Sequence, residues 1–317
     1  MRAVVGHICS RVLLFLLFFL LAYFLMAELL HRSMIQGRRL NTHIQSKSAR
    51  IGGQEHKMLR DFDPLQQYDV FVVGSSHAYR GYDPRLFEVH GYRLFNAGSS
   101  SQHPAVSDVL MRSMLPRLKN KPLVIFDLYH RILEIDPTES SIRVIANSLE
   151  PEMAFRIMMV KPNVSALNTL VARYLAPDGM IETEPKDYVR DGYCSRDVEL
   201  QCDLDSLPGA FKINDQAMHG LRNGLEWLTA NGYRCVLVSH PMPPQKGRDI
   251  FQQGAVEAIQ QVNHEFRVPY FDFTTYDFGE QWKSYFWDAT HLNQRGVDVF
   301  NQLLIDTLCS AGYLSRK

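Results

Sequence analysis

The stretch YDVFVVGSSHA, residues 68–78, decides the fold that we predict for this chain. Its apolar residues run without alternation and end at Gly74, which is typical of a strand buried on both faces of a parallel sheet. Gly74 permits a tight turn, so Ser76 would stand at a helix N-terminus, where backbone N–H groups stabilise negative charge. Taken alone, Gly-Ser-Ser after a strand is more often a simple turn or a phosphate-contacting loop.

The same alternation of strand and helix continues along the chain. We expect further strands at 92–98, 122–128, 233–241 and 268–273, and helices at 104–118, 214–232, 249–266 and about 294–310. This pattern predicts an α/β fold with a mostly parallel sheet covered by helices on both faces. Ligands of such sheets bind beyond the carboxyl ends of the strands, so reactive residues are expected directly after strands.

One segment, about 135–212, does not fit the alternation. It begins with Met-rich and apolar sequence, including MAFRIMMV at 153–160, and then becomes polar. We interpret it as an insertion between a strand and the next helix. Two roles stay open for it, a cap over the functional site and a peripheral helical decoration.

The N-terminal region contains the uncharged run VLLFLLFFLLAYFLMA at 12–27. With its flanks, from Ile8 to Leu30, it reaches the roughly 20 residues that a helix needs to cross a bilayer. A cleaved signal peptide is the alternative, but the following AELLHRSM has no small-x-small cleavage site. The sequence therefore predicts an anchor at 8–30, a polar stalk or linker at 31–66, for which an approach helix stays open, and one domain at 67–317. Arginines on both sides of the span leave its orientation undecided.

Composition excludes several classes of function. The 317 residues include 34 Lys+Arg and 34 Asp+Glu, so the formal net charge is zero. The chain therefore lacks the excess of positive charge that is typical of nucleic-acid-binding proteins. The sequence has no Walker-type loop, no G-x-G-x-x-G motif and no metal-ligand cluster, so we expect neither cofactor nor metal.

Cys194 and Cys202 flank the polar segment CSRDVELQC and could form a disulfide outside the cytosol or stay free.

A second chemical signal, WDATHLNQRGVDVF at 287–300, precedes the last predicted helix. The spacing of Asp288 and His291 can place a carboxylate beside an imidazole and fix its tautomer. His291 could then accept the proton of a serine hydroxyl such as that of Ser76. The alternative is that Asp288 or Asn293 caps the last helix and His291 lies on the surface.

Taken together, the early serine motif and the late D-x-x-H motif resemble those of the SGNH/GDSL hydrolase family. The resemblance covers roughly 68–129 and 214–310. It implies a flavodoxin-like three-layer sandwich with a five-stranded sheet, and a triad of Ser76, Asp288 and His291, with Ser75 where GDSL enzymes have Asp. FNAGSSSQ at 95–102 resembles the block that contributes to the oxyanion hole. The candidates that it implies are Gly98, Ser100 and Ser101.

The chain departs from the family pattern after the third strand. The family has an oxyanion-stabilising Asn there, whereas this chain reads FDLYHR at 126–131. Tyr129 and His130 are the candidate donors, since the carboxylate of Asp127 could donate only if protonated. Three further histidines follow strand-like segments: His77, His103 and His240. A histidine in such a place is more often a hydrogen-bonded wall residue than a catalyst.

The GSSH form and the N-terminal anchor also resemble a narrower group, the extracytoplasmic SGNH-like proteins that work beside membrane-bound O-acyltransferases. This resemblance implies an extracytoplasmic domain, an acylated cell-surface or secreted polysaccharide as substrate, and a membrane-bound O-acyltransferase as partner. Ester hydrolysis and acyl transfer use the same residues and stay open. The absent Asn motivates a different alternative, a non-catalytic binding or assembly module with the same fold.

Overall fold

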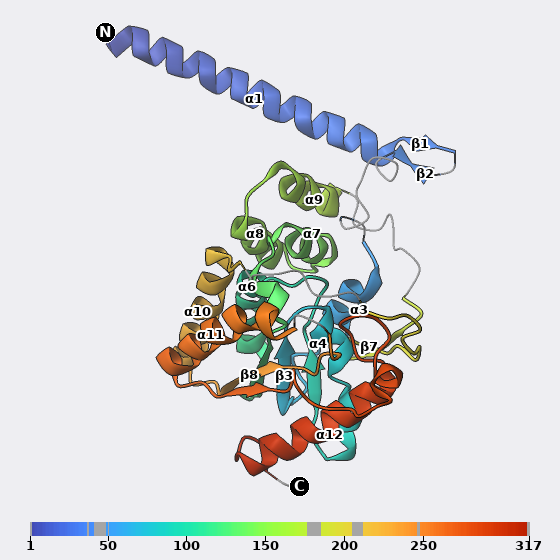
Figure 1. The fold of residues 1–317 in the computed structure, drawn as a ribbon. Helices are drawn as coiled ribbons and strands as arrows, with labels where there is room; N and C mark the ends of the chain where they lie inside the picture. Colours follow the sequence, from blue (N-terminus) through green and yellow to red (C-terminus); the bar gives the residue numbers. More distant parts are fainter. Residues whose placement is uncertain are drawn as a thin grey trace.

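The computed structural model describes residues 2–36, 38–40, 49, 51–175, 185–204, 212–245 and 248–315. Helix α1 (Arg2–Arg32) extends beyond an α/β domain that holds the rest of the described chain (Figure 1). Within α1, the 26 residues Val5–Leu30 are long and apolar enough to cross a membrane, a test that signal sequences also pass. The predicted apolar N-terminal helix is thus present.

The core of the domain is a five-stranded sheet in the order β4-β3-β5-β8-β9. Every neighbouring pair is parallel. In chain order this is 2-1-3-4-5, the flavodoxin-like arrangement, so the predicted α/β fold with a parallel sheet is confirmed. The strands are β3 (Val70–Val73), β4 (Leu94–Asn96), β5 (Leu123–Asp127), β8 (Cys235–Ser239) and β9 (Tyr270–Asp272).

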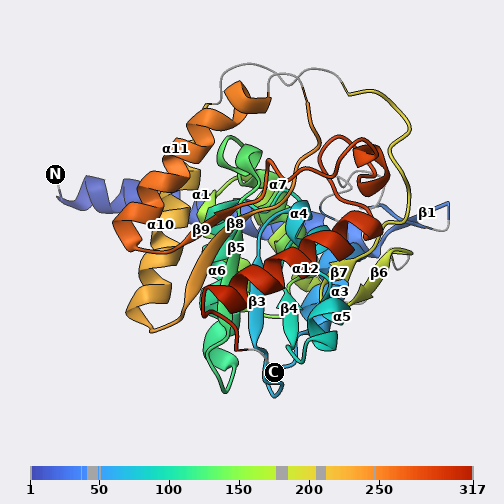
Figure 2. The same ribbon diagram turned by 60° about the horizontal axis from the view of Figure 1, so that its bottom comes forward.

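Helices cover both faces of the sheet, as Figure 2 shows. Alternate strand residues point to opposite faces, so Phe71 and Val73 belong to one apolar cluster while Val70 and Val72 belong to another. The first cluster packs against α6 (Pro104–Met114), α10 (Asp215–Ala230) and α11 (Arg248–Phe266). The second packs against α4 (Ser76–Gly81), α5 (Pro84–Val89) and α12 (Gln294–Ser310). Burial on both faces explains why the strands read as continuous apolar runs.

The segment expected to be a polar stalk is partly folded. Its start forms the short hairpin of β1 (Met34–Ile35) and β2 (Arg38–Arg39). Its end, however, forms α3 (Gly53–Asp61), whose Met58 and Leu59 pack into the first apolar cluster. The folded domain therefore includes residues before 67, because a few apolar side chains on α3 complete the core beside β4.

The segment from about 135 to 212 lies between β5 and α10, as expected of an insertion. It follows the 3₁₀ turn η3 (His130–Leu133) and contains α7 (Thr138–Asn147), α8 (Pro151–Val160), α9 (Val164–Leu175), β6 (Tyr188–Arg190) and β7 (Tyr193–Cys194). Two further 3₁₀ turns lie outside this segment, η2 (Leu115–Arg117) and η4 (Trp282–Tyr285).

Cys194 and Cys202, which could have formed a disulfide, are both free thiols. Cys194 is buried in β7 and Cys202 is exposed.

The turn between β6 and β7 presses on β4 through Gly192. A Cβ there would lie 1.8 Å from the Asn96 carbonyl oxygen, and the backbone has φ of +85°. We expect Gly192→Ala to lower the free energy of unfolding by about 3 kcal/mol or more, because backbone must move to relieve the overlap. Chemical denaturation monitored by circular dichroism measures this loss.

Gly279→Ala is the matched control for that prediction. Gly279 also has a left-handed φ of +75°, but nothing lies within 4 Å of the place that a Cβ would take. Only the backbone conformation is penalised there, by about 1 kcal/mol. Equal losses of stability in the two variants would contradict the close approach of Gly192 to β4.

Candidate active site

Ser76 stands directly beyond the carboxyl end of β3, beside the point where the strand order reverses between β3 and β5. Open α/β sheets bind their ligands at such a switch point. Gly74 allows the end of β3 to lie close to the end of β5. Any other residue there would place its Cβ only 2.8 Å from the Asp127 Cβ, too close for two carbon atoms. Ser76 is the first residue of α4, so its N–H has no acceptor inside the helix, and no described residue accepts from it.

A continuous chain of hydrogen bonds joins Ser76, His291 and Asp288. The Ser76 Oγ lies 2.8 Å from the His291 Nε2, and the His291 Nδ1 lies 2.9 Å from one oxygen of Asp288 and 3.0 Å from the other. A carboxylate can only accept, so the Nδ1 carries the proton and the Nε2 accepts from the Ser76 hydroxyl. This is the geometry that activates a serine for nucleophilic attack.

Local turn geometry holds Asp288 in place. One of its oxygens accepts from the backbone N–H groups of Thr290 and His291, each at 2.8 Å. Burial tends to raise the pKa of Asp288, but the hydrogen bonds and charge of His291 and those backbone N–H groups outweigh it, so the pKa is lowered. The carboxylate of Asp288 is thus ionised at neutral pH. The N-terminus of α12 is capped by Asn293, whose side chain accepts from the Gly296 N–H, so Asp288 is not the helix cap.

Two aromatic rings stack on the imidazole of His291. The ring of His77 has its centroid 4.1 Å away with the planes within 5°. The ring of Trp287 lies 5.3 Å away, with the planes 30° apart. Burial, followed by the nearby charges of His291 and His240, lowers the pKa of His77 well below its usual value. His77 is therefore a neutral ring at physiological pH, and an imidazolium at His291 would meet the aromatic rings of His77 and Trp287.

The stack continues beneath His77 into the interior. His77 also contacts the ring of His240, with centroids 4.4 Å apart. The His240 Nδ1 is 3.6 Å from Asp127, which accepts a 2.8 Å hydrogen bond from the Tyr82 hydroxyl. Neither ring nitrogen of His240 nor the second oxygen of Asp127 has a hydrogen-bond partner within the described chain. His240, Asp127 and Tyr82 thus form a row of buried polar side chains beneath His77.

The expected oxyanion donors divide into two groups. Tyr129 lies against His77 with ring centroids 3.8 Å apart, and burial raises its pKa to about 12, so its hydroxyl keeps its proton. His130 instead faces β8 and β9, with its Nε2 3.4 Å from both the Ser239 Oγ and the Tyr270 hydroxyl. Burial lowers the pKa of His130 to about 4, so it is a neutral packing residue.

The residues expected from the second block follow β4. Gly98 lies against the start of α4, because a Cβ there would meet the Tyr79 nitrogen at 2.9 Å. Its N–H donates to the Asn96 side chain at 3.1 Å. The Ser100 N–H donates to Glu55 at 3.1 Å, and Ser101 has a left-handed φ of 47°. The structure thus brings Gly98 beside α4, the helix that begins at Ser76, but gives the N–H groups of Gly98 and Ser100 internal partners.

From the sequence, His77 could line the site and His240 is interpreted as a wall residue, whereas Trp287 is not singled out. Two of these follow strands, and Trp287 directly precedes the D-x-x-H motif, but only the fold shows that their rings meet at His291. Trp287 is held in turn by Arg80 and Arg196, whose guanidinium carbons lie 5.3 and 4.9 Å from its ring centroid. Because Arg196 belongs to the insertion, that segment reaches the surroundings of the site.

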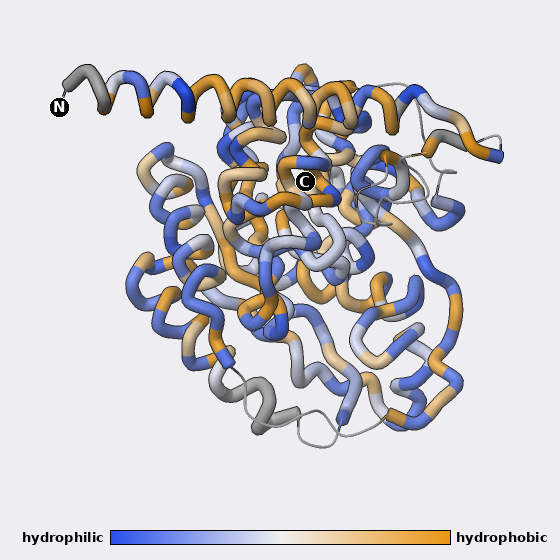
Figure 3. The backbone as a smooth tube through the Cα atoms, turned by 90° about the horizontal axis from the view of Figure 1, so that it is seen from above, coloured by the Kyte–Doolittle hydropathy of each residue, from blue (hydrophilic) through white to orange (hydrophobic). Residues whose placement is uncertain are grey.

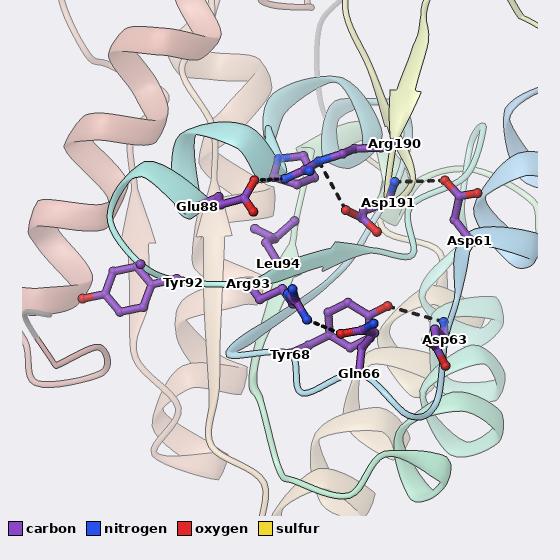
Figure 4. Close-up of a pocket in the computed structure, with 12 residues that line it drawn as sticks. Asp61, Asp63, Gln66, Tyr68, Glu88, Tyr92, Arg93, Leu94, Arg190 and Asp191 are labelled. Carbon is purple, nitrogen blue, oxygen red and sulfur yellow. Dashed lines mark hydrogen bonds and ion pairs between the residues drawn. The ribbon is translucent and has the colours of Figure 1, made fainter.

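A separate pocket of about 430 Å³ lies at the opposite end of the sheet (Figure 4). Its walls include Tyr68 and Arg93, which precede β3 and β4, so it opens at the amino ends of these strands. Its charged groups are engaged with one another: Arg190 pairs with Glu88 and Asp191. Its position away from Ser76 and the carboxyl ends of the strands argues against a part in the chemistry.

The solved structures that resemble this chain do so with low TM-scores and low sequence identity. No protein-family model matches the sequence, and a search of curated proteins found no match. The psychrotrophic esterase EstA from Pseudoalteromonas sp. aligns with a TM-score of 0.41 and 9% identity over 78% of this chain and 100% of its own. A GDSL-like lipase from Bacteroides thetaiotaomicron gives 0.39 and 15%, over 76% and 88% of the two chains. AlinE4, an SGNH-hydrolase family esterase, gives 0.35 and 13%, over 78% and 98%. The function of this chain is therefore inferred from its own residues.

Proposed function

We propose that the protein is a membrane-anchored serine esterase or O-acyltransferase. The observation that carries this proposal is the hydrogen-bond chain from the Ser76 Oγ through His291 to Asp288, with links of 2.8 and 2.9 Å. Ser76 and the Asp288–His291 pair, 215 residues apart in sequence from serine to histidine, meet at the switch point of the sheet. A serine hydroxyl bonded to an imidazole that a carboxylate orients is the arrangement required for acyl chemistry.

The reaction follows from these positions. The Ser76 Oγ attacks the carbonyl carbon of an ester, and its proton passes to the His291 Nε2. The tetrahedral oxyanion receives hydrogen bonds from the Ser76 N–H and, in this proposal, from the Tyr129 hydroxyl. The intermediate then expels an alcohol, which takes the proton from His291. The acyl-enzyme is resolved by water in an esterase, or by a hydroxyl of an acceptor polymer in a transferase.

The test uses a fluorophosphonate probe on the full chain, followed by peptide mass spectrometry. We expect a single phosphonyl adduct, on Ser76, because that hydroxyl alone among the described serines bonds to His291. An adduct on Ser75, or none under conditions where the protein is folded, would contradict the proposal. Adding an O-acylated oligosaccharide together with an unacylated acceptor separates the two reactions, since only a transferase yields an acylated acceptor.

The membrane setting and the partner are also part of the proposal. The apolar helix Val5–Leu30 supports an uncleaved anchor that would keep the site near a bilayer. The resemblance of GSSH plus an anchor to SGNH-like acylation proteins supports an extracytoplasmic site, an acylated polysaccharide substrate and a membrane-bound O-acyltransferase partner. Cross-linking in intact membranes, with recovery of a multi-span acyltransferase, tests the partner.

A non-catalytic assembly module is the second candidate. It is favoured by the internal partners of the Gly98 and Ser100 N–H groups, which leave few free donors for an oxyanion among the described residues. It predicts that Ser76→Ala and His291→Ala leave polymer acylation in cells unchanged. Loss of acylation in either variant would count against it.

His77 is expected to be a positioning residue for His291. We expect His77→Ala to slow fluorophosphonate labelling by roughly tenfold or more, because the imidazole loses the ring that fixes its plane. His77→Phe keeps an uncharged aromatic face and should retain most of the labelling rate. Rate constants for labelling across pH measure both effects. Equal losses in the two variants would contradict a role based on stacking.

A further inference from the structure

Two helices of the insertion expose an apolar surface that the proposed chemistry does not use. We call it the hairpin face; it consists of Phe155, Met159, Val164, Leu167 and Tyr174. These side chains are 53%, 53%, 73%, 44% and 40% exposed. Phe155 and Met159 are four residues apart on α8, while the others recur at helical spacing along α9. The opposite sides of both helices are buried, with Ile157 and Ala166 in the core.

Helix α1 lies directly beside this surface. The Tyr23 hydroxyl donates a 2.7 Å hydrogen bond to the Asn168 side chain, so α1 touches α9 next to Leu167. In Figure 1, α9 lies immediately below α1, and the view from above in Figure 3 shows the apolar part of α1 crossing over the domain. The apolar span is thus a neighbour of the α9 part of the hairpin face, and α8 packs against α9 on the side away from α1.

The length of α1 sets the depth of this contact. The 26 apolar residues measure about 39 Å at 1.5 Å per residue, more than the ~30 Å hydrocarbon core. Tyr23 precedes the end of that span by about 10 Å of helix, so with the roughly 9 Å excess on the C-terminal side it lies at the hydrocarbon boundary, where Tyr is enriched. Asn168, bonded to it, would lie at the same depth. The exposed apolar residues of α9 would then be at the boundary between the hydrocarbon core and the headgroups.

We propose that the hairpin face is a membrane-surface contact, buried in the headgroup–acyl boundary of the bilayer that α1 spans. This rests on the anchoring role proposed for α1. Lipid is the occupant because the α9 part of the face lies directly against α1, the helix that we propose to span the bilayer. The insertion thereby fixes the position of the Ser76 site relative to the membrane.

The test incorporates the photo-cross-linking amino acid p-benzoylphenylalanine, one position at a time, into the full chain in liposomes of defined phospholipid. Positions 155, 159 and 167 probe the hairpin face. Position 20, within the apolar span of α1, is the lipid-exposed reference. Position 89 is the matched control, since Val89 is 82% exposed and lies on α5, on the opposite face of the sheet. Mass spectrometry of the irradiated protein counts lipid adducts.

We expect lipid adducts at 155, 159 and 167 at roughly tenfold the level at 89, as interfacial burial requires. Adducts at 20 but not on the hairpin face would overturn the contact and leave the anchor standing. No adducts at 20 would overturn the anchor and the contact together. Adducts to a protein in native membranes, with none to lipid in liposomes, would overturn the lipid surface in favour of a protein partner.

A second variant tests the same contact without a cross-linker on α8. We expect Phe155→Glu combined with Met159→Glu to reduce the lipid adducts at position 167 by roughly tenfold, because carboxylates resist entry into the apolar boundary. Both side chains are exposed and distant from His291, so labelling of Ser76 should be unchanged. Unchanged lipid adducts at 167 would contradict the proposal.

Discussion

Ser76→Ala is expected to lower kcat for ester cleavage by roughly 10⁴-fold or more and to abolish fluorophosphonate labelling. The reason is that the Ser76 Oγ, 2.8 Å from the His291 Nε2, is the hydroxyl whose proton the imidazole can remove. Ester hydrolysis with a chromogenic acyl substrate measures kcat, and the apparent KM is expected to change little because binding does not require the nucleophile.

Ser75→Ala is the matched control for that substitution. The Ser75 Oγ accepts a 3.4 Å hydrogen bond from the His77 N–H and lies 3.2 Å from the His77 Nδ1, so it caps α4 instead of facing His291. Its loss should cost about 1 kcal/mol of stability while leaving kcat within roughly tenfold of the wild type. If Ser75→Ala were the inactive variant and Ser76→Ala the active one, the assignment of the nucleophile would be wrong.

Asp288→Asn is expected to lower kcat by roughly 10⁴-fold, a loss comparable with that of the nucleophile. One oxygen of Asp288 accepts from the Thr290 and His291 N–H groups, so the amide oxygen of the variant would take that position and its NH2 group would face the His291 Nδ1. A donor there favours the tautomer with the proton on Nε2, which cannot accept from the Ser76 hydroxyl. The lowered pKa of Asp288 adds a dependence on pH. Because ionised Asp288 stabilises the folded state, that contribution is present at neutral pH and is lost as the pH falls through its folded-state pKa.

The measurement compares kcat and unfolding across pH for Asp288→Asn and Asp298→Asn. Asp298 is an exposed carboxylate on α12 that accepts from Gln294 at 2.9 Å. The control should keep its kcat, and its unfolding should follow the wild type as the pH is lowered. A similar small loss in both variants would indicate that Asp288 only caps the turn before α12.

Several elements could be predicted from sequence because their signals are local. Continuous apolar runs ending at a turn predicted the parallel strands, and the parallel order of the sheet confirms the α/β fold. The absence of polar residues in the N-terminal run predicted the apolar helix that α1 contains. The polarity of 31–66 left α3 open between a stalk and an approach helix, and it did not predict that a few apolar side chains such as Met58 would fix that helix in the core.

The donors around the candidate nucleophile could not be predicted, because they depend on side-chain direction. Tyr129 and His130 are neighbours in sequence, yet the first faces His77 and the second faces Tyr270. A change of backbone direction between β5 and η3 separates them. Likewise Gly98 approaches α4 while its N–H points to Asn96, which only the packing of the loop after β4 decides.

Residues 68–78 determined by themselves a buried strand and a serine at the start of a helix, because hydrophobic pattern and turn chemistry act over a few residues. Spacing along the chain likewise placed Asp288 beside His291. Only the tertiary structure decided that His291 meets Ser76, 215 residues away in sequence, and that His77 and Trp287 stack on its ring. The physical reason is that parallel strands bring their carboxyl ends to one edge of the sheet, so contacts between distant loops are set by strand order and not by sequence distance.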